Sequence, residues 1–170
     1  PPVLVTVSSI AAAGPTERGK VKTEADPCTP ISNYGRSKRG GEVAAEMFAG
    51  KMPITVIRPG IVFGPGDRLL LPAFRALRMM RLHVVPGMRP PPLSYIYVGD
   101  LIQLLCQAAA SGRRLPAERE GQNGDGYYFA CVNEYPNYSE FGRMLRKAVG
   151  RRFAPIVSVP EPLPTLIASL

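Results

Sequence analysis

Two short runs rich in β-branched residues, VLVTV at positions 3–7 and ITVI at positions 54–57, constrain the fold more than any other feature. Mostly apolar runs of this length are typical of strands buried on both faces of a parallel sheet. A helical pattern from Tyr34 to Ala49 separates them, so the connection is far too long for a hairpin. Strand, helix and strand in this order predict a parallel crossover unit. The sequence therefore predicts an α/β fold with a parallel sheet.

The segment between the two runs also predicts its own boundaries. Val43, Ala44 and Met47 fall on one stripe, which indicates an amphipathic helix, and Gly50 can end that helix. Residues 10–33 show no periodicity and carry several Gly and Pro residues. A structureless loop of this length is unusual in a compact domain and is often functional.

Strands and helices continue to alternate along the rest of the chain. Residues 58–68, RPGIVFGPGDR, are expected to form a Gly-Pro loop. Asp100 and Asn137 are expected to cap the helices that follow them. The pattern predicts helices at about 70–81, 100–110 and 138–149, and extended segments at 82–85, 94–98, 127–132 and 153–159.

Composition limits the classes of partner. The chain has 170 residues, a net charge of +8 and a pI near 9.8, but no run of Lys and Arg exceeds two residues. Aromatic residues do not alternate with the basic ones as a stacking platform requires, so we expect no nucleic-acid partner. No apolar run reaches the ~18 residues of a membrane helix and no signal peptide is visible. We therefore expect no membrane partner and a cytoplasmic location.

The residues that most often hold metals are few and far apart. Cys28, Cys106 and Cys131 have no metal-ligand spacing, and His83 is the single histidine. We expect free thiols in a reducing compartment and no metal site.

Polar residues from separate segments should meet at one edge of the predicted sheet. Ser8 and Ser9 follow the first strand, Tyr34 and Lys38 begin the next helix, and residues 58–60 follow the second strand. A crossover helix runs opposite to its strands, so its N-terminus lies at the carboxyl edge of the sheet. Open α/β sheets bind their ligands at that edge.

Tyrosine and lysine four positions apart share one face of a helix. A free phenol has a pKa near 10, so it stays protonated at neutral pH and cannot act as a base. A neighbouring ammonium favours the phenolate and lowers that pKa. Such a phenol can take a proton from an alcohol or return it to a carbonyl, while a serine hydroxyl holds the same oxygen. A hydride acceptor is missing from this set, which implies a nicotinamide cofactor.

The stretches VSSIAAAGP, YGRSK, ITVIRPGIVFGPGDR and SYIYVGDLIQLL, in this order and spacing, resemble the extended short-chain dehydrogenases/reductases. The chain is most similar to the NAD-dependent epimerase/dehydratase type, including members like 3β-hydroxysteroid dehydrogenase and dihydroflavonol reductase. The resemblance implies a partial Rossmann-like parallel sheet, the C-terminal part of a doubly wound fold. Residues 1–68 would belong to the dinucleotide-binding domain and residues 69–170 mainly to a small substrate-binding α+β region, with residues 94–132 partly returning to the Rossmann core.

The resemblance also implies roles. Tyr34 would be the catalytic acid/base, Lys38 would favour its phenolate and hold the nicotinamide ribose, and Ser9 would be the catalytic hydroxyl. Contacts to NAD or NADP are implied for Ser8, Tyr34, Lys38, Pro59, Gly60, Ile61 and Val62. Contacts to a small-molecule substrate are implied for Ser9, Ala11, Tyr34 and Arg68, with residues 64–68 and 82–94 bordering that substrate. A homodimer is also in keeping with the family.

Two departures from the family pattern matter. The G-x-x-G-x-x-G turn that seats the pyrophosphate has no counterpart in this sequence, so the choice between NAD and NADP cannot be read. Leu93 stands where nucleotide-sugar epimerases carry an arginine, which favours a hydrophobic or small alcohol or ketone over a sugar nucleotide.

Three functions therefore stay open at this level. The first is hydride transfer between NAD(P) and a secondary alcohol or ketone. The second is a catalytically silent chain, because the pyrophosphate turn is absent. The third is a basic module that binds nucleic acid or membrane through its charge, which a salt titration would reveal.

Overall fold

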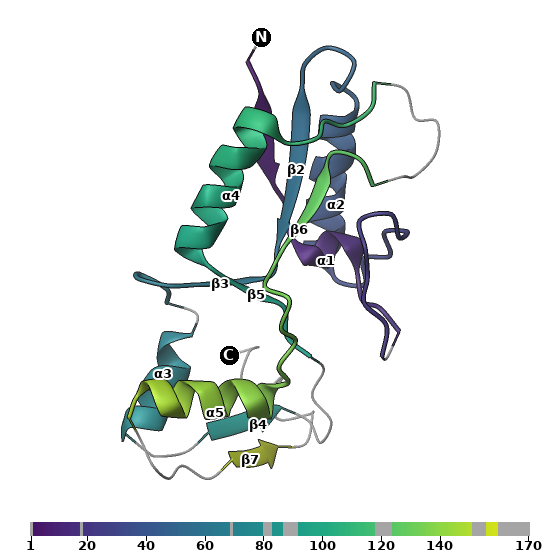
Figure 1. Ribbon diagram of the computed structural model, residues 1–170. Coiled ribbons are helices and arrows are strands. Elements are labelled where there is room, and N and C mark those ends of the chain that lie inside the picture. Colours follow the sequence, from purple (N-terminus) through teal and green to yellow (C-terminus); the bar gives the residue numbers. More distant parts are fainter. Residues whose placement is uncertain are drawn as a thin grey trace. The chain divides into compact units, whose positions relative to one another are not determined.

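A parallel sheet carries the first half of the fold. β1 (Leu4–Val7), β2 (Ile54–Pro59) and β6 (Tyr127–Ala130) lie in the order β1-β2-β6, with Val5 opposite Thr55 (Figure 1). All neighbouring strands are parallel. The predicted α/β class and parallel crossover are confirmed.

The computed structural model describes residues 2–17, 19–68, 70–79, 83–86, 92–117, 124–150 and 156–159. The chain forms two compact units. The first unit combines residues 1–62 with 95–131, and the second combines residues 63–94 with 132–170. Each unit is described by itself below.

Helices cover both faces of the sheet in the first unit. α2 (Asn33–Glu46) connects β1 to β2, and α4 (Val98–Ser111) lies on the other side (Figure 1). Ile54 and Val56 pack in a cluster with α2 and the turn after it, whereas Ile57 packs in a cluster with α4. Burial of each such side chain stabilises the fold by about 1.5–3 kcal/mol. This alternation also directs Arg58 to the α2 face of β2.

The apolar stripe expected to mark the inner face of α2 does not do so. Val43 is 40% and Met47 76% exposed, whereas the buried positions of the helix are Gly35 and Glu42. The helix turns a carboxylate inward because Arg58 reaches it from β2, at 2.8 Å. An ion pair, and not the apolar stripe, therefore decides which face of α2 is buried.

Two parallel strands and two helices lie in the part of the second unit that the structure describes. β4 (His83–Pro86) pairs with β7 (Ile156–Val159), and α3 (Leu71–Met79) and α5 (Tyr138–Ala148) accompany them. A small apolar cluster joins the helices: Phe74, Phe141 and Leu145.

Of the two helix caps predicted from the sequence, Asn137 is confirmed and Asp100 is wrong. Asn137 caps α5 as expected, because its side chain accepts from the Glu140 amide and Glu140 reaches back to the Asn137 amide, each at 2.9 Å. Asp100 is not the N-cap of α4. That helix begins at Val98, and Asp100 lies in its first turn, where a carboxylate interacts favourably with the helix dipole.

Two elements lie inside segments that were predicted as loops. α1 (Ile10–Ala13) is too short to show a period and depends on its ends, Ser9 and Gly14. β3 (Ile61–Phe63) pairs with β5 (Tyr95–Tyr97) within the predicted Gly-Pro loop. The predictions for residues 80–82, 87–91 and 153–155 lie outside the described residues.

Candidate active site

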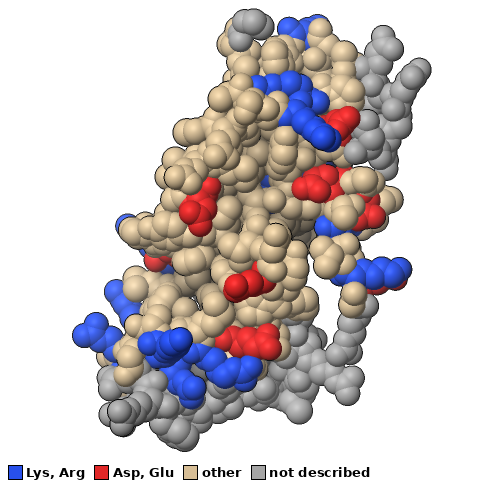
Figure 2. Space-filling model, in the orientation of Figure 1, with Lys and Arg blue, Asp and Glu red and all other residues tan. Residues whose placement is uncertain are grey.

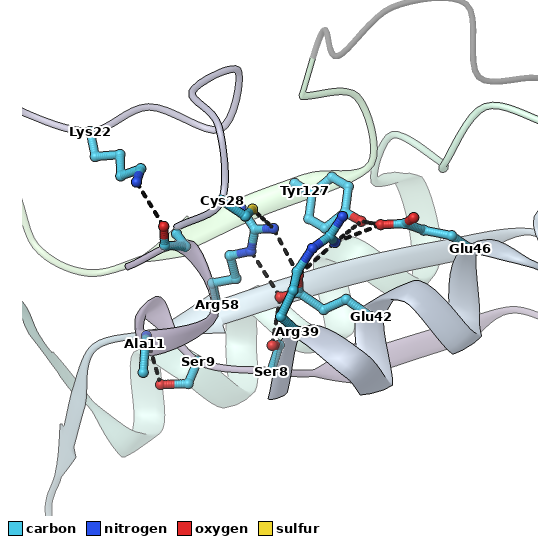
Figure 3. A network of polar contacts seen from close by, with 11 residues as sticks. Ser8, Ser9, Ala11, Lys22, Cys28, Arg39, Glu42, Glu46, Arg58 and Tyr127 are labelled. Atoms are coloured by element: carbon cyan, nitrogen blue, oxygen red, sulfur yellow. Dashed lines mark hydrogen bonds and ion pairs between the residues drawn. The ribbon is translucent and has the colours of Figure 1, made fainter. Parts of the chain in front are cut away.

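The turn after β1 places two neighbouring serines in different surroundings. The Ser8 side chain is buried and its hydroxyl donates to Glu42 Oε1 at 2.6 Å. Ser9 has an extended backbone, caps α1 and accepts from the Ala11 amide at 3.2 Å (Figure 3). A hydroxyl that accepts one bond can still donate its own proton. The Glu42 carboxylate accepts the hydrogen bond of the Ser8 hydroxyl, whereas the hydroxyl proton of Ser9 is not used for that bond.

A close backbone approach brings α2 against α1. A Cβ on Gly35 would lie 2.4 Å from the Ala11 carbonyl oxygen, so only glycine fits there without a shift. The Ser32 side chain accepts from the Gly35 amide at 3.0 Å and begins the helix at this point. The contact places Tyr34, in the first turn of α2, beside the short helix that Ser9 caps.

Tyr34 and Lys38 lie together near the end of β1. The Lys38 Nζ is 5.9 Å from the centroid of the Tyr34 ring and donates to the Val7 carbonyl at 3.4 Å. The Tyr34 side chain is 58% exposed. The structure thus brings a phenol and an ammonium to the strand end that leads into Ser9.

The other predicted contacts divide between the units. Pro59 is buried at the end of β2, and the Gly60 amide donates to the Ala130 carbonyl at 3.1 Å, which fixes the backbone that leads into Ile61 and Val62. Arg68 is exposed and belongs to the second unit.

Sequence reasoning missed a buried ionic network behind this edge. Glu42, fully buried, accepts from Arg58 Nε at 2.9 Å, from Arg58 Nη2 at 2.8 Å and from Arg39 Nη1 at 3.0 Å (Figure 3). Arg39 also contacts Glu46 at 2.6 Å, and Glu46 accepts from the Tyr127 hydroxyl. The network therefore spans the end of β1, helix α2, β2 and β6.

Aromatic rings and a thiol complete the surroundings of Arg58. Its guanidinium carbon lies 4.3 Å from the centroid of Tyr127 and 5.6 Å from that of Phe129, and Nη2 donates to Cys28 Sγ at 3.1 Å. Planar guanidinium groups stack on aromatic faces and bind carboxylates through two parallel bonds. Arg58 uses both properties at once.

Burial and pairing act in opposite directions on the charges of the network. Burial alone would raise the pKa of the Glu42 carboxyl, but hydrogen bonds from Arg58 and Ser8 outweigh it and lower that pKa. Burial likewise opposes the charge of Arg58, and the bonds to Glu42 raise its pKa. For Tyr127, burial and the bond to Glu46 both raise the phenol pKa. Glu42 and Arg58 therefore stay ionised, and Tyr127 stays neutral.

A cavity of about 710 Å³ lies against this network. Cys28, Arg39, Arg58 and Tyr127 are among the residues that line it. Ser9, Tyr34 and Lys38 do not line it, so the cavity and the candidate catalytic residues are separate features of the first unit.

In the described part of the chain, neither the surface charges nor the possible metal ligands indicate a second candidate functional site. Basic and acidic side chains share the face shown in Figure 2. Within the described ranges, no three His, Cys, Asp and Glu side chains are grouped as metal ligands, and the three cysteines are free thiols. None of the helices in the described part of the chain is long and apolar enough to cross a membrane.

Comparison with known proteins identifies the chain's relatives. The model of the 3-beta hydroxysteroid dehydrogenase/isomerase family matches residues 2–160. No curated protein sequence matches the chain.

Solved structures share the fold. UDP-glucose 4-epimerase of Thermus thermophilus, in complex with NAD, is 19% identical, with a TM-score of 0.76 over 99% of this chain and 58% of that one. dTDP-glucose 4,6-dehydratase of Bacillus anthracis, in complex with NAD, is 20% identical, with a TM-score of 0.75 over 92% and 49%. RMD of Pseudomonas aeruginosa, complexed with NADPH, is 17% identical, with a TM-score of 0.71 over 94% and 55%. This chain spans 49–58% of the length of these structures.

Proposed function

Because the chain belongs to the 3-beta hydroxysteroid dehydrogenase/isomerase family, we propose that its protein transfers a hydride between NAD or NADP and a secondary alcohol or ketone. The observation that carries this proposal is the Lys38 ammonium, 5.9 Å from the Tyr34 ring centroid, next to the strand end that leads into Ser9. The cofactors named for the structural relatives, NAD and NADPH, are consistent with a nicotinamide and leave the choice between the two open.

Each residue has a role that its surroundings support. Tyr34 exchanges a proton with the substrate oxygen, and its exposure leaves the phenol within reach of a ligand. Ser9 donates a hydrogen bond to the same oxygen. The Lys38 ammonium, 5.9 Å from the centroid of the Tyr34 ring, holds the nicotinamide ribose next to that phenol.

The residues at this edge fit the nicotinamide end of a dinucleotide. The bond from Lys38 to the Val7 carbonyl is long, at 3.4 Å, and an ammonium carries three donors, so donors remain for ribose hydroxyls. The Gly60 backbone, held by Ala130, offers a fixed surface to a ring. When bound, the nicotinamide supplies the hydride acceptor that the side chains lack. Ser8 is proposed to contact the cofactor through its backbone, since its hydroxyl faces Glu42.

The proposed class of substrate depends on the residue at position 93. Leu93 is buried in the second unit, where its amide donates to the Pro136 carbonyl at 2.8 Å. An apolar side chain where epimerases of nucleotide sugars carry arginine favours an apolar alcohol or ketone over a sugar nucleotide. Within the second unit, Arg68 and its neighbours in residues 64–68 are proposed to border that substrate.

The proposal is tested with the Tyr34→Phe variant of the protein expressed from its complete gene, with a 3β-hydroxysteroid and with UDP-glucose as probes. Loss of the phenol should lower kcat by about 10²–10⁴-fold. Cofactor binding should persist, because the ring and Lys38 remain. Tyr135→Phe, which removes an exposed phenol in the second unit, is the matched control and should keep its turnover. Unchanged turnover in Tyr34→Phe rejects the assignment.

A further inference from the structure

Glu42 receives hydrogen bonds from three places in the first unit. Ser8 follows β1, Arg39 lies one turn earlier in α2, and Arg58 is near the end of β2 (Figure 3). The carboxylate is fully buried and Arg58 is 1% exposed, so the bonds from Ser8 and Arg58 are made away from water, whereas the Arg39 side chain is 22% exposed. Within the described residues, no buried side-chain nitrogen or oxygen lacks a partner.

Each donor is the immediate sequence neighbour of a residue that the proposed function uses. Ser8 precedes Ser9, and Arg39 follows Lys38. Arg58 precedes Pro59, where the proposed cofactor surface begins. Consecutive Cα atoms are about 3.8 Å apart, so a shift of one neighbour moves the other. A shift of the Glu42 carboxylate would therefore move residues in three parts of the candidate site.

The form of the network makes it a rigid link. Arg58 binds Glu42 through Nε and Nη2, at 2.9 and 2.8 Å, which is the two-bond geometry that fixes both groups in plane. Satisfied polar networks in a low-dielectric interior hold one arrangement of their members. By contrast, the direct bond from Lys38 to the Val7 carbonyl is 3.4 Å long and exposed.

We propose that Glu42 is a positioning residue of the candidate active site. It holds the turn after β1, helix α2 and the end of β2 in the relative arrangement that Ser9, Tyr34 and Lys38 require. Glu42 acts through its neighbours, since its carboxylate faces Ser8 and Arg58 in the interior. This inference rests on the proposed function for its catalytic consequence, but not for the structural link itself.

Three variants of the protein expressed from its complete gene separate positioning from simple stability. Ser8→Ala removes one arm and leaves the pair of Glu42 and Arg58 intact. Glu42→Gln keeps the shape and removes the charge. Thr55→Val is the matched control, because Thr55 is fully buried on the same strand as Arg58 and its hydroxyl bonds to the Arg113 carbonyl and to Arg114, each at 2.8 Å.

Turnover and local mobility are measured together. With a 3β-hydroxysteroid and saturating cofactor, kcat should fall about tenfold in Ser8→Ala and about a hundredfold in Glu42→Gln, but within about twofold in Thr55→Val. The cofactor KM should change much less than kcat. Amide hydrogen exchange over residues 8–13 and 58–62 should accelerate in both network variants and not in the control.

The outcomes decide between the explanations. Equal losses of kcat in Ser8→Ala and Thr55→Val, or unchanged exchange over residues 8–13 in both network variants, would overturn the positioning role. If Glu42→Gln does not fold, Ser8→Ala against Thr55→Val still decides. If Tyr34→Phe retains full turnover, the proposed function fails, and the exchange comparison alone then decides whether Glu42 links the three segments.

Discussion

The two halves of α2 differ sharply in how their polar residues are bound. In the first half, Tyr34 is 58% exposed and Lys38 makes a long bond to the Val7 carbonyl. In the second half, Glu42 is fully buried and receives hydrogen bonds from three residues. One helix thus carries the proposed catalytic residues at its start and, in its second half, the carboxylate of the ionic anchor that Glu42 forms with Arg58.

This difference separates the tasks of chemistry and support. A group that exchanges protons with a ligand needs unused hydrogen-bonding capacity and access to solvent or substrate. A group that fixes geometry needs the opposite, because an unsatisfied buried charge is costly and a satisfied one holds its partners. The unfolding free energy should therefore respond strongly to loss of the contacts between Glu42 and its partners, and weakly to loss of the Tyr34 and Lys38 side chains.

The largest expected effect follows from removal of the cation of the anchor. Arg58→Ala leaves the Glu42 carboxylate buried without its main partner, which should cost about 3–5 kcal/mol of unfolding free energy. Urea unfolding measures this loss. The double variant Arg58→Met with Glu42→Leu should recover part of it, because apolar residues of similar volume can replace a buried pair. A loss below that of an ordinary surface substitution would contradict the assignment of Glu42 and Arg58 as the anchor.

The sequence predicted the exposed half of α2 better than the buried half. Tyr34, Lys38 and Ser9 were placed at one edge by a topological rule that needs only strand order and helix direction. Glu42 gave no such signal, since a glutamate in a helix usually faces solvent, and Val43 and Met47 suggested a different inner face. Its contact with Arg58 depends on the register of β2 against α2, which no local pattern contains.

A signal for the anchor was nevertheless present. Ile54 and Val56 alternate along one face of a strand that was predicted to be buried, and Arg58, which was predicted to begin the following loop, continues that alternation. A charged residue on a buried face needs a charged partner, and α2 is the element that covers that face. α1, in contrast, could not be predicted from periodicity, because four residues span barely one turn.

A smaller effect should distinguish two glycines of the same helix. Gly35→Ala should destabilise the fold by about 1–3 kcal/mol, because the new Cβ would collide with the Ala11 carbonyl. Gly40→Ala is the matched control, since its Cβ would meet open space, and it should stabilise the helix by about 1 kcal/mol. Thermal unfolding of both variants tests the close approach of α1 and α2. Equal effects at the two positions would contradict it.

The pH dependence of the unfolding free energy should also show the effect of the ion pair between Glu42 and Arg58. The pKa of Glu42 in the folded chain is lowered from its ordinary value of 4.5. Its contribution to stability is therefore complete above that value and is lost as the pH falls through the lowered pKa. Unfolding free energies measured from neutral pH downward should fall less steeply for Glu42→Gln than for the parent. Parallel curves for the two proteins would show that Glu42 does not titrate as an anchored carboxylate.

The smallest effect is expected where the chemistry is proposed. Tyr34→Phe and Lys38→Met should each change the unfolding free energy by less than about 0.5 kcal/mol, because Tyr34 is exposed, Lys38 is half-buried, and neither change leaves a buried group unpaired. The same urea titration that reveals the loss in Arg58→Ala provides the measurement. A large loss in Tyr34→Phe would mean that the phenol is a structural group, and its effect on turnover could then no longer be assigned to proton transfer. A small loss combined with a large fall in kcat would instead separate the reactive half of α2 from its anchored half in one experiment.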